Sequence, residues 1–161
     1  MKFTHELTYD ASPADVYAML SDPAFREKVC AAQRVVSAEV TLTPRGADGF
    51  SLVVDQVQDT SDLPSIARKI TGDTTQAVVE EEWTSPSGGT VTILSPGKPT
   101  SIGGTVALEA DGSGTREVVT LDAKVKVPLV GGKLESMLAE QIRKNLDVEQ
   151  GVGTAWLAGE R

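Results

Sequence analysis

The feature that most constrains this chain is a long amphipathic segment near its C-terminal end. Residues 133–158 predict one helix, because apolar side chains recur there at helical spacing: Leu134, Leu138, Ile142, Val148, Val152 and Trp156. The stripe must be buried on a sheet face, since nothing else in the chain is large enough to cover it. Gly151 and Gly153 each weaken the last third by about 1 kcal/mol relative to alanine, which predicts a bend or early fraying.

Strands cluster ahead of this helix instead of alternating with helices, which favours the α+β class. Alternating side chains and turn residues predict seven strands, over 2–10, 34–43, 49–58, 75–84, 89–95, 101–110 and 118–127. The last is the clearest, because Val119, Leu121, Ala123, Val125 and Val127 share one face. An antiparallel sheet with one dry and one wet face gives this pattern. Short helices are predicted from Pro13, over 24–33 and over 63–70.

Composition excludes several classes of function. The chain has 161 residues, which predicts one domain over 1–161. Its net charge of −8 and its scattered basic residues argue against nucleic acid and against anionic membranes. One cysteine cannot form an internal disulfide, and no stretch reads as a signal peptide or a membrane span, so a cytoplasmic protein is expected. A single histidine excludes the HExxH and Cys₂His₂ zinc sites.

The order of elements, together with five segments, resembles that of START-like domains, the SRPBCC or polyketide-cyclase and lipid-transport superfamily. The local match is closer to an uncharacterised bacterial family of such domains. The segments are Phe3-Thr4-His5-Glu6, Asp10-Ala11-Ser12-Pro13, the stretch from Leu63-Pro64 to Gly72, Glu81-Glu82-Trp83, and Lys124-Val125-Lys126-Val127-Pro128-Leu129-Val130-Gly131-Gly132-Lys133-Leu134-Glu135. The resemblance implies a helix-grip fold, in which a curved antiparallel sheet of about seven strands wraps around the long C-terminal helix. It also implies a cavity between them that typically takes an apolar small molecule. No defined catalytic motif carries over to this sequence, and no cofactor or metal is expected.

Three polar residues interrupt the apolar stripe of the long helix. With Leu134 set at zero, Gln141, Asn145 and Glu149 fall at about 340°, 20° and 60°. A buried polar group without a partner costs roughly 1–3 kcal/mol. Either these side chains line a ligand site, or they bond to strand backbone or lie in solvent beyond the sheet edge.

Four further residues are candidates for ligand contact. His5 lies on the apolar face of the first strand, where it could contact a ligand or be a core histidine. Alternation places Glu81 and Trp83 on the inner face, whereas Glu80 and Glu82 face water. The competing interpretation is that the strand is solvated and Glu81 lies in water, because unpaired buried acids are rare. Gln56 shares a face with Val54 and is a candidate of the same kind.

Two other features have a functional and a structural interpretation. Cys30 could pair with His5 as a nucleophile dyad, or be a buried structural thiol. Gly131-Gly132-Lys133 opens the long helix and could hold an anion, or be only a flexible turn into it.

Three hypotheses of function follow. The first is a binding protein for an apolar or amphipathic small molecule or lipid, as a monomer or homodimer. The second is a cyclase- or dehydratase-type enzyme in the same cavity, with His5 or Glu81 as the acid–base group. The third is a protein-interaction domain with a filled core and a large exposed apolar patch. The segment 59–72 and the helices of 13–33 are expected to shape the cavity mouth.

Overall fold

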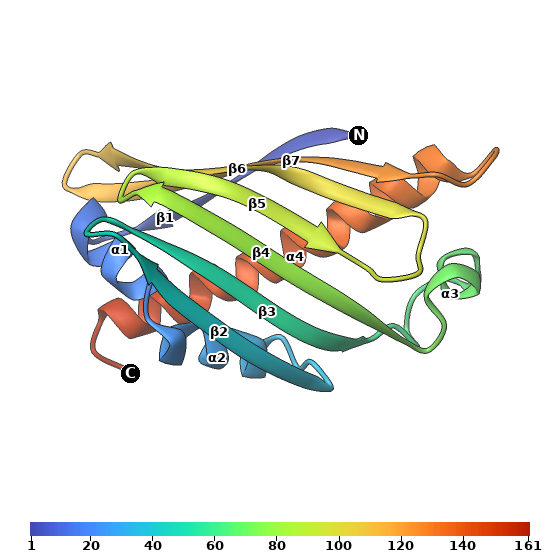
Figure 1. Cartoon of the computed structure of the whole chain (residues 1–161), viewed down its shortest axis with the longest axis horizontal. Coiled ribbons are helices and arrows are strands. Elements are labelled where there is room, and N and C mark those ends of the chain that lie inside the picture. Colours follow the sequence, from blue (N-terminus) through green and yellow to red (C-terminus); the bar gives the residue numbers. More distant parts are fainter.

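A computed structural model describes residues 1–161, in which all seven strands form one antiparallel sheet of order β1-β7-β6-β5-β4-β3-β2 (Figure 1). The α+β helix-grip architecture is therefore confirmed. The elements in chain order are β1 (Lys2–Tyr9), α1 (Pro13–Leu20), α2 (Pro23–Ala32), β2 (Ser37–Arg45), β3 (Gly49–Asp59), α3 (Ser65–Thr71), β4 (Thr74–Ser85), β5 (Gly88–Leu94), β6 (Thr100–Asp111), β7 (Gly114–Val125) and α4 (Gly131–Leu157).

Two strands, β2 and β7, differ from their predicted bounds by more than one residue. β2 runs on through Pro44 to Arg45, where a turn was expected. Proline is tolerated there because β2 is an edge strand that pairs only with β3. β7 begins at Gly114 and not near residue 118, so its alternation also places Thr115 and Glu117 on the buried face. The second difference changes the chemistry of the sheet interior, because Glu117 was not expected there.

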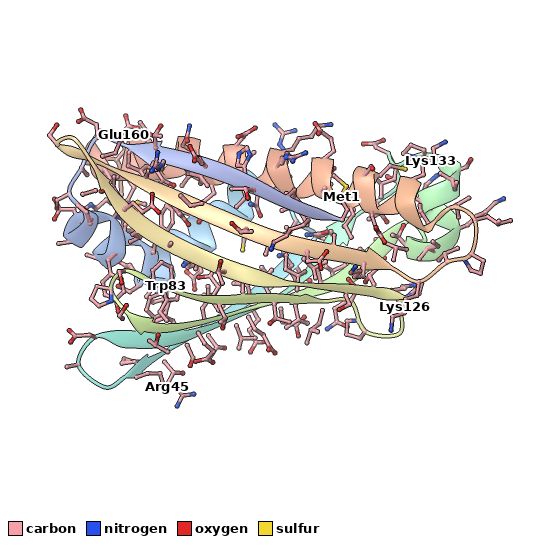
Figure 2. The ribbon with its side chains drawn as sticks, turned by 90° about the horizontal axis from the view of Figure 1, so that it is seen from above. Met1, Arg45, Trp83, Lys126, Lys133 and Glu160 are labelled. Carbon is pink, nitrogen blue, oxygen red and sulfur yellow. The ribbon has the colours of Figure 1, made fainter.

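The long helix α4 lies across one face of the sheet (Figure 1), and its two ends, near Lys133 and Glu160, reach opposite ends of the molecule (Figure 2). It packs against β1 and β7 and against α1 and α2. The Phe25 ring of α2 meets the Trp156 ring edge-on, with centroids 5.6 Å apart. No helix of the structure combines the length and the apolar character needed to cross a membrane.

The expected early fraying of α4 does not occur, because the helix continues without a break through both glycines to Leu157. Gly153 is buried where α4 crosses β1. A Cβ atom on it would lie 2.6 Å from Cε1 of Tyr9 and 3.1 Å from Cε of Met19. Gly151, by contrast, faces open space. Gly153 therefore permits close packing of α4 on β1, whereas Gly151 only makes the helix less stable.

Two separate apolar clusters support the helix. The larger one contains Leu7, Val16, Leu20 and Phe25 and extends along the sheet to Trp83. A smaller cluster joins α3, the end of β7 and the first turns of α4, through Ala67, Val125 and Leu134. Near it, Oε2 of Glu135 accepts a hydrogen bond of 3.0 Å from the backbone N–H of Val125. The two ends of α4 are thus fixed to the sheet by different sets of contacts.

The two glycines provide a matched test of this packing. Gly153→Ala is expected to lower the free energy of unfolding by about 1–3 kcal/mol, because the added methyl group overpacks the contact with Tyr9. Gly151→Ala is expected to raise it by about 0.5–1 kcal/mol, because alanine favours the helix and meets nothing. Urea denaturation of both variants checks this, and equal effects of the two substitutions would contradict the close approach of α4 to β1.

Candidate functional site

A cavity of about 630 Å³ lies between the inner face of the sheet and the helices α2, α3 and α4. Its walls are mainly aliphatic side chains of β3 to β7, including Leu52, Val54, Val91, Ile102 and Val119. α1 contributes no lining residue, whereas the segment 58–71 and α2 both do. The cavity therefore has aliphatic walls along the strands, and many polar side chains line it as well.

A row of polar side chains runs along the cavity side of α4. Gln141, Asn145 and Glu149 all line the cavity, and their spacing of four residues spreads them over about 12 Å of helix. Gln141 is exposed and Asn145 half-buried, whereas Glu149 is buried. Nε2 of Gln141 donates to Oδ1 of Asn145 at 3.3 Å, and none of the three bonds to strand backbone. The row therefore leads from solvent to the inner end of the cavity.

At that inner end a guanidinium group is buried. Arg26 of α2 is 7 % exposed and donates from Nε to the carbonyl oxygen of Leu20 at 2.8 Å. Its two terminal nitrogens donate to the carboxylate of Glu81, at 3.3 and 2.9 Å. Nε1 of Trp83 donates to Oε2 of Glu81 at 2.8 Å. Burial alone lowers the pKa of Arg26, but the surrounding carboxyl groups outweigh that effect and raise it above its usual value.

Two more carboxyl groups share this end with Arg26. Oε1 of Glu149 lies 3.6 Å from a terminal nitrogen of the guanidinium. Burial raises the pKa of Glu149 to about 7, against the opposing effect of Arg26. Glu117 of β7 is 4 % exposed, and burial together with the charge of Glu149 raises its pKa well above the usual range. Three glutamates thus share one arginine. The raised pKa values favour the protonated, uncharged form of Glu117 and Glu149.

Several buried polar atoms along the cavity and at its inner end have no hydrogen-bond partner. Four of them belong to side chains that line the cavity: Gln56 Oε1, Thr75 Oγ1, Thr100 Oγ1 and Glu117 Oε2. The hydroxyl of Tyr9 is also unpartnered, and burial raises its pKa, with the charges of Glu117 and Glu149 acting in the same direction. Such atoms are rare in folded proteins, and here they concentrate around one space.

The structure brings together five of the seven residues selected from the sequence. Gln56, Glu81, Gln141, Asn145 and Glu149 all line the cavity. Trp83 does not line it and contacts Glu81 from behind, with its ring stacked on Phe50 at a centroid distance of 5.4 Å.

His5 also lies outside the lining. Its Nε2 is paired at 2.8 Å with Oδ1 of Asp147, on a part of α4 that is open to solvent. The histidine is therefore directed at the helix surface, away from the buried carboxyl groups.

The dyad and anion hypotheses gain no support from the local geometry. Burial raises the pKa of Cys30, which opposes formation of the thiolate that a nucleophile requires. A Cβ atom on Gly131 would lie 2.6 Å from the carbonyl oxygen of Val125, so this glycine serves the tight turn into α4. The structural interpretation accounts for both features.

Sequence reasoning missed Arg26 and Glu117, although each left a signal. Glu117 precedes Val119 by two residues and so continues the alternation of the buried face of β7. Arg26 stands three and four residues before Val29 and Cys30, on the buried side of α2. A charge at such a position predicts a buried partner, and the partners here come from β4 and α4.

Comparison with known proteins identifies the family. A family model described as "Protein of unknown function (DUF2505)" matches residues 4–157. The chain belongs to this family. An uncharacterized protein of Mycobacterium tuberculosis is 26 % identical over 119 residues, covering 70 % of this chain and 68 % of that protein. The match to an uncharacterized protein of Mycobacterium bovis has the same extent.

Solved structures that resemble this member of the DUF2505 family share its fold. The protein TTHA0849 from Thermus thermophilus superposes with a TM-score of 0.67 at 23 % identity, over the full length of both chains. Norcoclaurine synthase from Thalictrum flavum has a TM-score of 0.61 at 12 % identity, covering 99 % of this chain and 87 % of that one. The di-domain ARO/CYC StfQ of steffimycin biosynthesis has a TM-score of 0.60 at 14 % identity, covering 96 % of this chain and half of the other. These similarities support a START-like fold.

The raised pKa of Glu149 predicts how stability depends on pH. A carboxyl group with a higher pKa in the folded state stabilises the fold below its unfolded pKa, near 4.5, and that contribution is lost as the pH rises to about 7. Glu149→Gln is therefore expected to remove a loss of about 3 kcal/mol between pH 5 and pH 8. Urea denaturation across this range tests it, with Glu140→Gln on the exposed side of α4 as control. A wild-type pH profile in the Glu149 variant would contradict the burial of its charge.

Removing Arg26, the only buried cation, should make the loss of stability between pH 5 and pH 8 larger. Arg26→Met leaves three carboxyl groups without a counter-charge and is expected to cost about 3–5 kcal/mol at pH 8. The cost should shrink at pH 5, because the carboxyl groups then take up protons. Denaturation at both pH values measures the difference, and Lys28→Met on the exposed side of the same helix is the control. A cost that does not depend on pH would show that Arg26 acts through packing alone.

Proposed function

We propose that this protein binds an apolar or amphipathic small molecule in the cavity between the sheet and α4. The apolar walls supply affinity, at about 25 cal/mol for each Å² of ligand surface removed from water. The polar residues Gln56, Glu81, Gln141, Asn145 and Glu149 supply orientation. The proposal takes residues 1–161 as one domain that acts in the cytoplasm, as a monomer or homodimer, without metal or cofactor.

The observation that carries this proposal is the concentration of unpartnered buried polar atoms in the cavity lining. Each such atom costs roughly 1–3 kcal/mol if nothing bonds to it. Gln56 and Glu117 are 5 % and 4 % exposed, so bulk solvent does not reach them freely. A ligand with an apolar body and a few polar groups satisfies both parts of the lining at once.

The two alternative functions fit this interior less well. A protein-interaction domain was expected to have a filled core and a large exposed apolar patch. The large apolar residues that are exposed, Val36, Leu94 and Leu129, lie on separate segments of the chain. For an enzyme, His5 lies outside the cavity and Glu81 is held by Arg26 and Trp83.

Filling the cavity tests the binding proposal. The uncharged dye Nile red is expected to bind the wild-type protein saturably, with a rise in fluorescence. Ala77→Phe places a ring inside the cavity, because Ala77 is buried and lines it, and should weaken dye binding by about tenfold or more. Val78→Phe puts the same ring on the opposite face of β4 and serves as the control. Equal binding by both variants, or none by the wild type, would refute a ligand site in this cavity.

A further inference from the structure

We propose that the inner end of the cavity, formed by Arg26, Glu81, Glu117 and Glu149, is a site for the ammonium group of an amphipathic amine. The inference rests on the proposed function and narrows its ligand class. The ammonium group replaces a proton that Glu117 and Glu149 otherwise hold, so that binding exchanges one cation for another.

The balance of charge at this end points to a cationic ligand. Arg26 is committed to Glu81 through two hydrogen bonds and to Leu20 through a third. Glu149 is only 3.6 Å from the same guanidinium, and Glu117 has no ion pair. When all groups are ionised, three negative charges therefore face one positive charge in an enclosed space. A ligand carboxylate would add a fourth negative charge, whereas an ammonium group removes part of the imbalance.

Other basic side chains do not supply the missing charge. Arg34, Lys98 and Lys144 also belong to the cavity lining, but Arg34 and Lys144 are exposed. Arg26 is the cation whose charge lowers the pKa of Glu117 and Glu149. No basic side chain other than Arg26 forms an ion pair with Glu81, Glu117 or Glu149.

Hydrogen-bonding capacity points in the same direction. Oε2 of Glu117 is unpartnered in a side chain that is 4 % exposed, and the unpartnered hydroxyl of Tyr9 is influenced by both Glu117 and Glu149. An ammonium group has three donors and no acceptor. An ionised carboxylate and a phenol oxygen are acceptors that suit it. The aliphatic wall above this end, with Val106 and Val119, accommodates the carbon frame of such an amine.

The groups that face Glu149 determine how binding depends on pH. They are Arg26 and Cys30 of α2, Glu81 of β4, Glu117 of β7 and Tyr9 of β1. Burial keeps a proton on Glu149 up to about pH 7, where its pKa lies. Below that pH an incoming ammonium group must displace the proton, so affinity for an amine falls as the solution becomes more acidic.

Three probes with one carbon frame test this inference: 4-phenylbutylamine, 4-phenylbutan-1-ol and 4-phenylbutyrate. Displacement of Nile red gives their affinities at pH 6 and pH 8. We expect the amine to bind best, the carboxylate worst, and the amine to lose about tenfold in affinity at pH 6. Calorimetry at pH 6 in two buffers of different ionisation enthalpy should show release of about one proton for each amine bound and none for the alcohol.

Variants of the same shape show which carboxyl groups produce the preference for the amine. Glu117→Gln and Glu149→Gln keep shape and remove a charge, and each should reduce the preference for amine over alcohol by about tenfold. Glu80→Gln, on the outer face of β4, should leave the preference unchanged. Equal affinity for amine and alcohol, tightest binding of the carboxylate, or amine binding without proton release would overturn the inference. In each of those outcomes Nile red still binds to the wild-type protein. If the proposed function itself is wrong, neither Nile red nor any of the three probes binds in the cavity.

Discussion

The fold depends on how one long helix covers one curved sheet. The seven strands turn an apolar face to one side, and α4 is the element long enough to span it. The helix is held closely at its C-terminal end, where Gly153 meets Tyr9 and Trp156 meets Phe25. Its other end is held by the smaller cluster around Val125 and Leu134. Between these two attachments lies the cavity, which is therefore part of the architecture and not a local packing defect.

The buried charges have a cost that the fold offsets in two ways. Arg26 stabilises the carboxylate of Glu81 through two hydrogen bonds, and Nε1 of Trp83 donates a third. Glu117 and Glu149 lack an equivalent cation, and burial raises the pKa of each. Retaining two such carboxyl groups beside an apolar space does not favour stability, because a neutral side chain of similar size costs less. Their presence is consistent with the proposed binding of a cationic ligand in the cavity.

The structure also redistributes roles among the residues that sequence patterns selected. His5 occupies the inner face of β1 as expected, but its partner Asp147 holds it at the surface of α4. Glu81 lies inside as expected, but as the partner of Arg26. The group whose pKa lies near neutrality is Glu149, which the helical stripe had indicated only as a polar interruption.

Local patterns were enough to predict the order of helices and strands and the polar row of α4, but they missed the start of β7 and with it the buried Glu117. Period-two and helical periodicity depend on side chains close in sequence, so one chain suffices to read them. The sequence determined that Gln141, Asn145 and Glu149 lie on one helix face with the apolar stripe. Only the tertiary structure decided that Arg26 of α2 meets Glu81, Glu117 and Glu149 from three other elements. Charge pairing, burial and the resulting pKa values depend on distances between segments far apart in the chain, and periodicity carries no information about those distances.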